Sequence, residues 1–369
     1  MTVEPAVPPE VLARIRAPFL EGAAEPVDPP VLLPLSLLLD LTGEALRARL
    51  FVVAGEGGAE LALRPDFTAP IARAHVESGR AEGRYVYEGR AFRVPPPGSD
   101  RPSEFLQLGL ERLGAAAGPA ADAETAGLAW RAARAGGRDD LSLLVGDLSV
   151  ADALLAALET PPLAAGRIRR ALSDPDALGR ALDHRPSPQG PAGGLAGLIA
   201  GRPEGEGAAI VEEVWALAGV QPVGGRTALE IARRLGGKAA LDEPLSEPSR
   251  HILRRAFALQ GAPDAVLDQL AALAREHGLA LDPALDAASG RLGALAAAGV
   301  NGPIVFAPGF GRPFSYYDGM LFEVRSAALG PDRPVAAGGR YDRLPPALGG
   351  PATPAVGCMV RPARAWSER

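Results

Sequence analysis

The chain has almost no cysteine and almost no lysine. Its 369 residues include one cysteine, Cys358, and one lysine, Lys238. A single thiol excludes an internal disulfide framework and zinc sites built from several cysteines, and it fits a reducing compartment. A single lysine, set in a glycine-rich turn, leaves one candidate for Schiff-base or P-loop chemistry. We discard both kinds of chemistry as explanations of this sequence.

Long apolar runs and an excess of positive charge are also missing. No stretch of about 18 apolar residues occurs, and the start MTVEPAVPPE lacks the basic and apolar regions of a secretion signal. We therefore expect a cytoplasmic protein that does not enter a membrane. The chain has 38 Lys and Arg against 44 Asp and Glu, a formal net charge of -6. Nucleic acid is therefore not an expected partner.

What is present indicates a globular protein of mixed α and β structure. Apolar residues make up 47% and charged residues 22%, and the length suits one large or two medium domains. Apolar spacing predicts helices over 9–21, 69–77, 121–135, 264–277 and 283–298, with another from about Ser149. Short apolar runs bounded by Gly and Pro predict strands over 50–53, 60–63, 84–93, 105–113, 141–145, 303–307, 320–325, 334–337 and 355–360.

Glycine and proline clusters punctuate the middle of the chain. Between residues 161 and 259 the pattern consists mostly of short helical segments interrupted by such clusters. We interpret this region as a helical insertion that divides a core into two parts, 1–160 and 260–369.

A first polar cluster, Arg64-Pro65-Asp66-Phe67-Thr68, follows a predicted strand. The Asp66 carboxylate and the Thr68 hydroxyl are two residues apart and together suit one ammonium group. The alternative is that they cap the helix that follows, which is the more common role of such residues.

A second cluster lies on the two strands of a predicted hairpin. On a strand with a period of two, Gln107, Gly109 and Glu111 share one face, and the three leucines between 106 and 110 share the other. The leucine face is expected to pack against the core. The face with Gln and Glu is expected to line a polar site.

A third cluster joins arginines to phenols near the C-terminus. Arg312 precedes Tyr316 and Tyr317, and Arg340-Tyr341 follows about 23 residues after Tyr317. A guanidinium pairs with a carboxylate, and phenol hydroxyls reach ring nitrogens, so the set suits a small zwitterion. A β-turn with packed tyrosines explains these residues singly, but not their combination with the other two clusters.

In chain order, the segments RPDFTAPIARA, YEGRAFR, FLQLGLE, RPFSYYDGMLFE and AGGRYDRL resemble the catalytic core of the histidyl-tRNA synthetases. The resemblance spans about Pro30 to the C-terminus, except for the insertion. It implies an α+β fold of the class II aminoacyl-tRNA synthetase type, an antiparallel sheet flanked by helices. It also implies a histidine pocket in which Asp66, Thr68 and Gln107 hold the amino group, Arg312 the carboxylate, and Glu111, Tyr317 and Tyr341 the imidazole, with Tyr316 close by.

The nucleotide site of that family is altered here. Arg93 matches the arginine that grips the ATP α-phosphate, but Pro95 replaces an acidic residue that helps to hold ATP. In the family's third motif, Arg361 stands where a glycine leaves room for ATP, Ala363 replaces a glutamate, and Arg364 matches an arginine. Arg93 and Arg364 would then be vestiges of a nucleotide site. We expect no catalytic residue, no metal and no cofactor, and no anticodon-binding domain.

A core with this pattern resembles the regulatory subunits of ATP phosphoribosyltransferase. That resemblance implies a non-catalytic protein that assembles with the short catalytic subunit, is required for its activity, and transmits feedback inhibition by L-histidine in the first step of histidine biosynthesis. It further implies a homodimer within a hetero-octamer, and class II cores commonly dimerise near residues 30–41. Histidine would act by binding the active and inhibited complexes with different affinity.

Two other functions remain open from the sequence. One is a truncated histidine-activating, ATP-dependent ligase, which is supported by Arg93, Arg312 and Arg364 and opposed by Pro95, Arg361 and Ala363. The other is a scaffold whose pocket binds nothing. Four retained polar groups on one surface argue against the scaffold, because unpaired buried polar groups are costly.

The remaining chemistry-bearing residues are expected to be inert. His75, His184, His251 and His277 are scattered and show no metal-ligand spacing, and Cys358 lies in an apolar run that suits a buried thiol. In the predicted site, Ser315 replaces a residue that is usually Asp in the family, and Pro313 stiffens the loop that presents Arg312. The order of the glycine-rich segments near residues 309 and 338 is a hypothetical reporter of ligand occupancy.

Overall fold

The computed structural model describes residues 4–42, 44–114, 118–185, 195, 198–199, 202–218, 227–233, 244–312 and 316–368. The chain divides into two compact units, Met1–Ala151 with Phe257–Arg369, and Asp152–Ala256. Lys238, Pro313 and Ser315 lie outside the described residues. None of the described helices is both long and apolar enough to cross a membrane.

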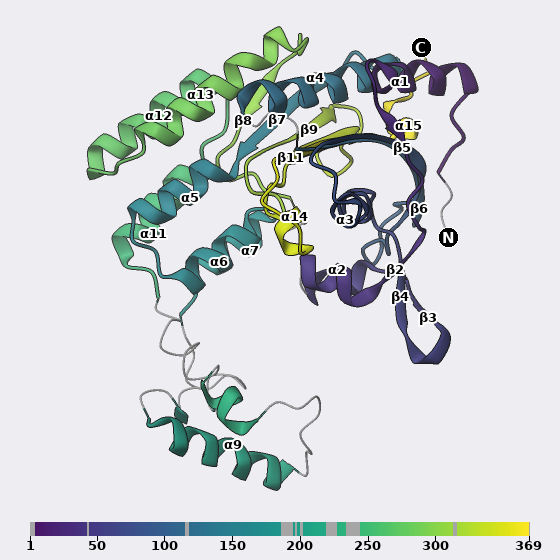
Figure 1. The fold of residues 1–369 in the computed structure, drawn as a ribbon. Helices are drawn as coiled ribbons and strands as arrows, with labels where there is room; N and C mark the ends of the chain where they lie inside the picture. The colour runs from purple at the N-terminus through teal and green to yellow at the C-terminus, as the bar shows by residue number, and fades with distance from the viewer. Residues whose placement is uncertain are drawn as a thin grey trace. The chain divides into compact units, whose positions relative to one another are not determined.

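The first unit is built on a sheet of eight strands in the order β1-β5-β6-β11-β10-β9-β7-β8 (Figure 1). The six central strands pair antiparallel, which confirms the predicted core, while the outer pairs β1 with β5 and β7 with β8 are parallel. The strands are β1 (Glu25–Pro26), β5 (Gly83–Phe92), β6 (Glu104–Leu113), β7 (Leu141–Asp147), β8 (Ile304–Phe306), β9 (Met320–Ser326), β10 (Ala336–Arg340) and β11 (Ala355–Val360).

Both predicted hairpins are present. The long one pairs β5 with β6 in unbroken register from Gly83 opposite Leu113 to Phe92 opposite Glu104. The short one belongs to a separate three-stranded sheet in the order β2-β4-β3, made of β2 (Leu32–Pro34), β3 (Val52–Ala54) and β4 (Glu60–Leu63). Gly57 turns this hairpin with φ +66°, a backbone conformation that glycine adopts without strain.

Helices of the first unit pack on this sheet. The long helix α4 contacts β9, β10 and β11, with α1 and α13 alongside it (Figure 1). Small side chains make this contact close: alanines of α4 are buried, and a Cβ on Gly127 would collide with the Ala298 carbonyl. The helices are α1 (Pro9–Leu20), α2 (Leu35–Thr42), α3 (Thr68–Ser78), α4 (Pro119–Ala135), α12 (Pro263–His277), α13 (Asp282–Ala297), α14 (Leu344–Ala347) and α15 (Pro362–Ala365).

A buried ion pair fixes α4 to the sheet beside the site described below. Arg340, at the end of β10, donates through Nε to Asp122 of α4 at 2.8 Å, and Asp122 is 2% exposed. Arg340 also donates to Asp342 at 3.0 Å. Because Tyr341 lies between these two residues, the pair also restricts where the Tyr341 phenol can lie.

The second unit is helical in its described part. Its elements include α6 (Pro162–Ala171), α7 (Pro175–Leu182) and α9 (Glu204–Ala218), while α5 (Leu148–Ala157) leads into it and α11 (Glu247–Phe257) leads out. The Asp174 side chain caps α7 by accepting from the backbone N–H groups of Asp176 and Ala177. A small apolar cluster around Ile199 and Val211 forms part of its core.

Candidate functional site

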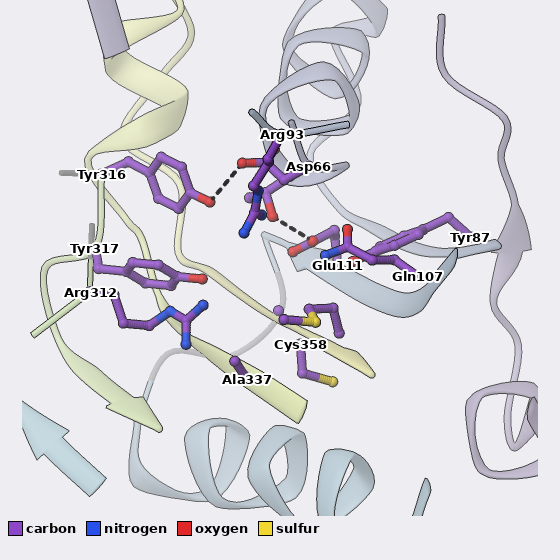
Figure 2. A pocket seen from close by; sticks show the side chains of 13 residues that line it. Asp66, Tyr87, Arg93, Gln107, Glu111, Arg312, Tyr316, Tyr317, Ala337 and Cys358 are labelled. Atoms are coloured by element: carbon purple, nitrogen blue, oxygen red, sulfur yellow. Dashed lines mark hydrogen bonds between the residues drawn. The ribbon is translucent and has the colours of Figure 1, made fainter. Parts of the chain in front are cut away.

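The three polar clusters of the sequence meet in one pocket of the first unit (Figure 2). The pocket is narrow, with a cavity volume of about 20 Å³. Seven of the eight residues predicted to bind histidine line it, and the eighth, Tyr341, lies behind Glu111. The lining is Asp66, Thr68, Tyr87, Arg93, Gln107, Glu111, Arg312, Tyr316, Tyr317, Ala337, Gly357, Cys358 and Met359.

Asp66 combines the two roles that the sequence left open. Its Oδ1 accepts from the backbone N–H of Ala69 in the first turn of α3, at 3.4 Å, and its Oδ2 accepts from the Tyr316 hydroxyl, also at 3.4 Å. Burial raises the pKa of the Asp66 carboxyl, and the nearby Arg93 guanidinium opposes that rise. The carboxylate therefore stabilises the helix start and still faces the pocket.

Glu111 is the most enclosed carboxyl group of the pocket. It is 1% exposed, its Oε1 accepts from the Thr68 hydroxyl at 2.8 Å, and its Oε2 accepts from the Tyr341 hydroxyl. Burial raises its pKa to about 8, although the hydrogen bonds from Tyr341 and Thr68 favour the charged form. At neutral pH the carboxyl therefore mostly retains its proton.

Gln107 supplies an unpaired acceptor. It lies on β6 two positions before Gly109, on the same face as Glu111, and is 1% exposed. Its Oε1 has no hydrogen-bond partner among the described residues. A buried acceptor left unpaired costs about 1–3 kcal/mol, so this oxygen suits a donor on a bound molecule. With the Asp66 carboxylate, it forms an end of the pocket that favours an ammonium group.

Three phenols and one guanidinium complete the pocket. The rings of Tyr316 and Tyr317 are 4.8 Å apart, and Tyr341 meets them edge-on at 6.0 and 6.4 Å. Arg312 donates to Glu323 at 2.6 Å, and its Nε has no partner among the described residues. Glu323 thus holds the guanidinium in place and leaves part of it available to an anion.

Arg361, which the sequence analysis placed at the altered nucleotide site, is buried among other residues of the protein. The Arg361 guanidinium lies 3.6 Å from the centre of the Phe105 ring and donates to the carboxylate of Glu4, which also accepts from the backbone N–H of Leu106 at 3.0 Å. Glu4 lies 357 residues away in the sequence. The sequence indicated a bulky cation here, but offered no signal for its partner.

The two arginines that the sequence analysis assigned to a vestigial nucleotide site both donate to backbone carbonyls. Arg93 donates to the Pro65 carbonyl at 2.8 Å, and Arg364 donates to the Pro334 carbonyl at 3.0 Å. Burial lowers the pKa of Arg93 to about 10 and, together with nearby Arg361, the pKa of Arg364 to about 9. The structure places Arg93 in the pocket wall, whereas Arg364 does not line the pocket.

Tyr87 is a pocket residue that the sequence prediction omitted. Its ring stacks on Phe67 at 4.4 Å between centroids, opposite Gly109. A strand period of two from Tyr85 would have indicated this face. Cys358 is buried, and burial raises the pKa of its thiol, in agreement with the predicted inert role. Buried His75 shares a hydrogen bond with Tyr85 at 2.8 Å.

No group of His, Cys, Asp and Glu side chains in the described part of the chain is arranged to hold a metal ion. The lining combines carboxyl and amide acceptors, phenol hydroxyls and two guanidinium groups, that of Arg93 near Asp66 and that of Arg312, and this set suits a small zwitterionic molecule.

Comparison with known proteins places the chain in a family. The histidyl-tRNA synthetase family model matches residues 23–198 and 208–364. Among solved structures, an ATP phosphoribosyltransferase regulatory subunit/histidyl-tRNA synthetase from Bacillus halodurans aligns with a TM-score of 0.68 at 20% identity, covering 100% of this chain and 83% of that one. A histidyl-tRNA synthetase from a Nostoc species aligns with a TM-score of 0.60 at 16% identity, covering 96% and 69%. These likenesses confirm the class II fold.

Curated relatives are closer in sequence. A protein of Brucella anthropi named ATP phosphoribosyltransferase regulatory subunit is 35% identical over 373 residues, which cover 97% of this chain and 96% of that protein. The protein of the same name from Brucella canis is 37% identical over 360 residues, covering 94% and 92%. The chain therefore belongs to the family of ATP phosphoribosyltransferase regulatory subunits, within the histidyl-tRNA synthetase-like proteins.

Proposed function

We propose that the protein is a non-catalytic regulatory subunit that binds free L-histidine and acts on the short catalytic subunit of an ATP phosphoribosyltransferase. In this role it activates the catalytic subunit and transmits feedback inhibition by histidine in the first step of histidine biosynthesis. The name shared by the Brucella relatives supports the partnership. Work beside a biosynthetic enzyme also suits the cytoplasmic location expected from the sequence.

One observation carries the proposal: the amino-acid pocket keeps its polar groups, while the nucleotide end is filled by Arg361 and Glu4. A ligase that activates histidine needs ATP next to the histidine carboxylate. A buried guanidinium stacked on Phe105 and paired to a carboxylate takes that space. The protein is therefore suited to bind an amino acid without reacting with it.

Each group of histidine has a counterpart in the proposed complex. Asp66 and the unpaired Oε1 of Gln107 accept from the ammonium group, and Arg312 donates to the carboxylate. Glu111, positioned by Tyr341, accepts from an imidazole N–H. A positive or hydrogen-bonding ring beside Glu111 favours its ionised form, so binding lowers the pKa of this carboxyl from about 8 and releases a proton at neutral pH.

Calorimetric titration of the whole chain with L-histidine, and separately with ATP, tests the binding step. We expect histidine to bind and ATP to give no heat of binding. Histidinol, which lacks the carboxylate, should bind more weakly if Arg312 contacts that group. The Glu111→Gln variant should lose at least tenfold in histidine affinity, because a buried charge-assisted contact contributes about 1.5–3 kcal/mol. Glu88→Gln, on the outer surface of β5, is the matched control.

ATP binding in the same sample, with exchange of pyrophosphate into ATP in the presence of histidine, would restore the ligase interpretation. Absence of histidine binding would support the scaffold instead. The two outcomes therefore separate the proposal from both alternatives that the sequence left open.

The proposed action on the catalytic subunit is tested by an assay that contains both proteins. The short catalytic subunit from the same organism should form phosphoribosyl-ATP from ATP and phosphoribosyl pyrophosphate faster when this chain is added, and histidine should suppress that gain. The Glu111→Gln variant should still stimulate the reaction but respond to histidine only at much higher concentration. Loss of stimulation in this variant would mean that the pocket is needed for activation itself, and not only for the response to histidine.

We also propose that the chain forms a homodimer within a hetero-octamer, with the small sheet β2-β4-β3 at the dimer interface. Apolar side chains are exposed on this sheet, namely Val31 at 42%, Leu32 at 44%, Val52 at 44% and Val53 at 40%. Clusters of this kind are typical of contact surfaces. Light scattering should give a dimer for the chain alone and a monomer for a Val53→Asp variant.

A further inference from the structure

A second pocket lies between α1, α4 and the β5-β6 hairpin, with a volume of about 350 Å³. It is separate from the amino-acid pocket although both use β6. Side chains alternate along a strand, so Leu110 and Arg112 line the second pocket while Glu111, between them, lines the first. We call the second pocket the Arg84 groove, after the residue argued next.

The groove contains more positive than negative side chains. Arg84 on β5 and Arg112 on β6 stand directly opposite each other in the antiparallel register. Like charges in this position destabilise a sheet unless a counter-charge is supplied. Glu124 of α4 pairs with Arg112 at 2.8 Å. No hydrogen bond or ion pair from the described residues reaches the Arg84 guanidinium, so one positive charge is left without a partner.

The other charges of the groove do not correct this imbalance. Arg131 pairs with Glu21 at 3.3 Å and also donates to the Ala298 carbonyl at 3.2 Å. The lining therefore has three guanidinium groups and two carboxylates. In a chain with a net charge of -6, such a local excess of positive charge is not a general property of the surface.

The backbone is shaped to admit the Arg84 side chain. Gly22, after the end of α1, has φ +79°, and a Cβ at this position would lie 2.3 Å from Arg84 Nη1. Glycine therefore allows the guanidinium to lie against the chain at one end of the groove. Beside it, Leu110 and Leu128 are packed into the protein at 1% and 6% exposure, so the surface that the groove offers is mainly polar.

We propose that the Arg84 groove binds a small anion with a phosphate or carboxylate group. The anionic oxygens accept from the Arg84 guanidinium, which presents two parallel N–H donors, and the positive field of Arg112 adds to the attraction. This ligand differs from histidine in both site and chemistry, so the proposal does not depend on the function proposed above.

Calorimetric titrations of the whole chain at constant ionic strength test the proposal. The probes are phenyl phosphate, benzoate, inorganic phosphate and the neutral benzyl alcohol. We expect at least one of the three anions to bind and benzyl alcohol to give no binding. Phenyl phosphate binding above benzoate would identify a phosphate monoester as the ligand class, and the reverse order would identify a carboxylate.

Three variants locate the binding. Arg84→Gln should weaken it at least tenfold, because a charge-assisted hydrogen bond is lost. Arg90→Gln removes the same charge from an exposed position on the same strand, where Arg90 pairs with Glu104, and should change the affinity less than twofold. Glu124→Gln frees Arg112 and should tighten binding severalfold.

Absence of saturable binding for all three anions would overturn the proposal. Equal weakening by Arg84→Gln and Arg90→Gln would also overturn it, because the attraction would then come from net charge alone. If Arg84→Gln fails to fold, as circular dichroism would reveal, Glu124→Gln remains decisive: unchanged or weaker binding in that variant contradicts the site.

Discussion

At the scale of single residues, Glu111 couples the pocket to the stability of the protein. Burial raises the pKa of its carboxyl to about 8 from 4.5. As the pH rises between these two values, the unfolded chain loses the proton while the folded chain keeps it. The folded state then binds more protons, so the free energy of unfolding falls with rising pH, by at most about 1.4 kcal/mol per pH unit.

The Glu111→Gln variant should lack this loss. We expect its free energy of unfolding to increase relative to that of the natural protein between pH 5 and pH 8, because glutamine does not titrate. Urea unfolding at both pH values measures the difference. Glu88→Gln, an exposed change on the neighbouring strand, should show no such trend. Parallel pH profiles for the natural protein and Glu111→Gln would mean that Glu111 ionises normally.

The pair of Glu4 and Arg361 is the second residue-scale feature with a measurable consequence. Their side chains are 7% and 5% exposed. Removing one member of a buried pair leaves the other charge without compensation, usually at a cost of about 3–5 kcal/mol. For Glu4→Gln we expect a loss of about 2 kcal/mol in the free energy of unfolding, because the short N-terminal segment can detach and admit water to Arg361.

Denaturant unfolding of Glu4→Gln, Arg361→Met and the double variant measures this pair as a cycle. The double variant should be more stable than the sum of the single losses predicts, since it leaves no buried charge unpaired. Glu10→Gln, an exposed change on α1, serves as the control. Additive losses would show that the two side chains do not interact in solution.

At the scale of elements, the β5-β6 hairpin explains why much of the site was predictable. An alternation with period two places Gln107 and Glu111 on one face, and the structure puts both in the pocket. A local pattern of this kind determines which side chains share a face of the strand. They also predicted the central strands and the helices that pack on them, to within a few residues at each end.

Other elements could not be predicted because no local pattern specifies them. β1 consists of only Glu25–Pro26, and its parallel pairing with β5 depends on how the chain returns across the sheet. The partnership of Glu4 with Arg361 joins opposite ends of the sequence. Contacts of this kind arise from the fold as a whole, so a single sequence gives no signal for them.

The loop before residue 313 is the element where occupancy of the pocket should be visible. Gly338, the other proposed reporter, lies in β10, which is paired on both sides by β9 and β11 and is already protected. With histidine bound to Arg312, we expect slower hydrogen exchange in residues 307–312 and little change in β10. Hydrogen exchange with and without histidine tests this, and unchanged exchange in the loop would argue against a contact with Arg312.

At the scale of the whole molecule, the proposed function requires a coupling between two binding events. Polar groups that suit an amino acid line the pocket of the first unit, and the guanidinium of Arg361, stacked on Phe105 and paired with Glu4, lies near Arg93 in the pocket wall. A regulatory subunit that binds histidine in this pocket changes its partner's reaction by favouring one state of the partner over another.

Such coupling is reciprocal, and this gives the last prediction. If histidine shifts the complex from an active to an inhibited state, the catalytic subunit and its substrates must alter the affinity for histidine by the same factor, usually 5-fold to 150-fold. We expect calorimetric histidine titration to give a higher Kd when the catalytic subunit is present with substrate analogues that hold it active. The Kd for the chain alone is the reference. Equal values, in a complex that histidine still inhibits, would place the inhibitory histidine on the catalytic subunit instead of in this pocket.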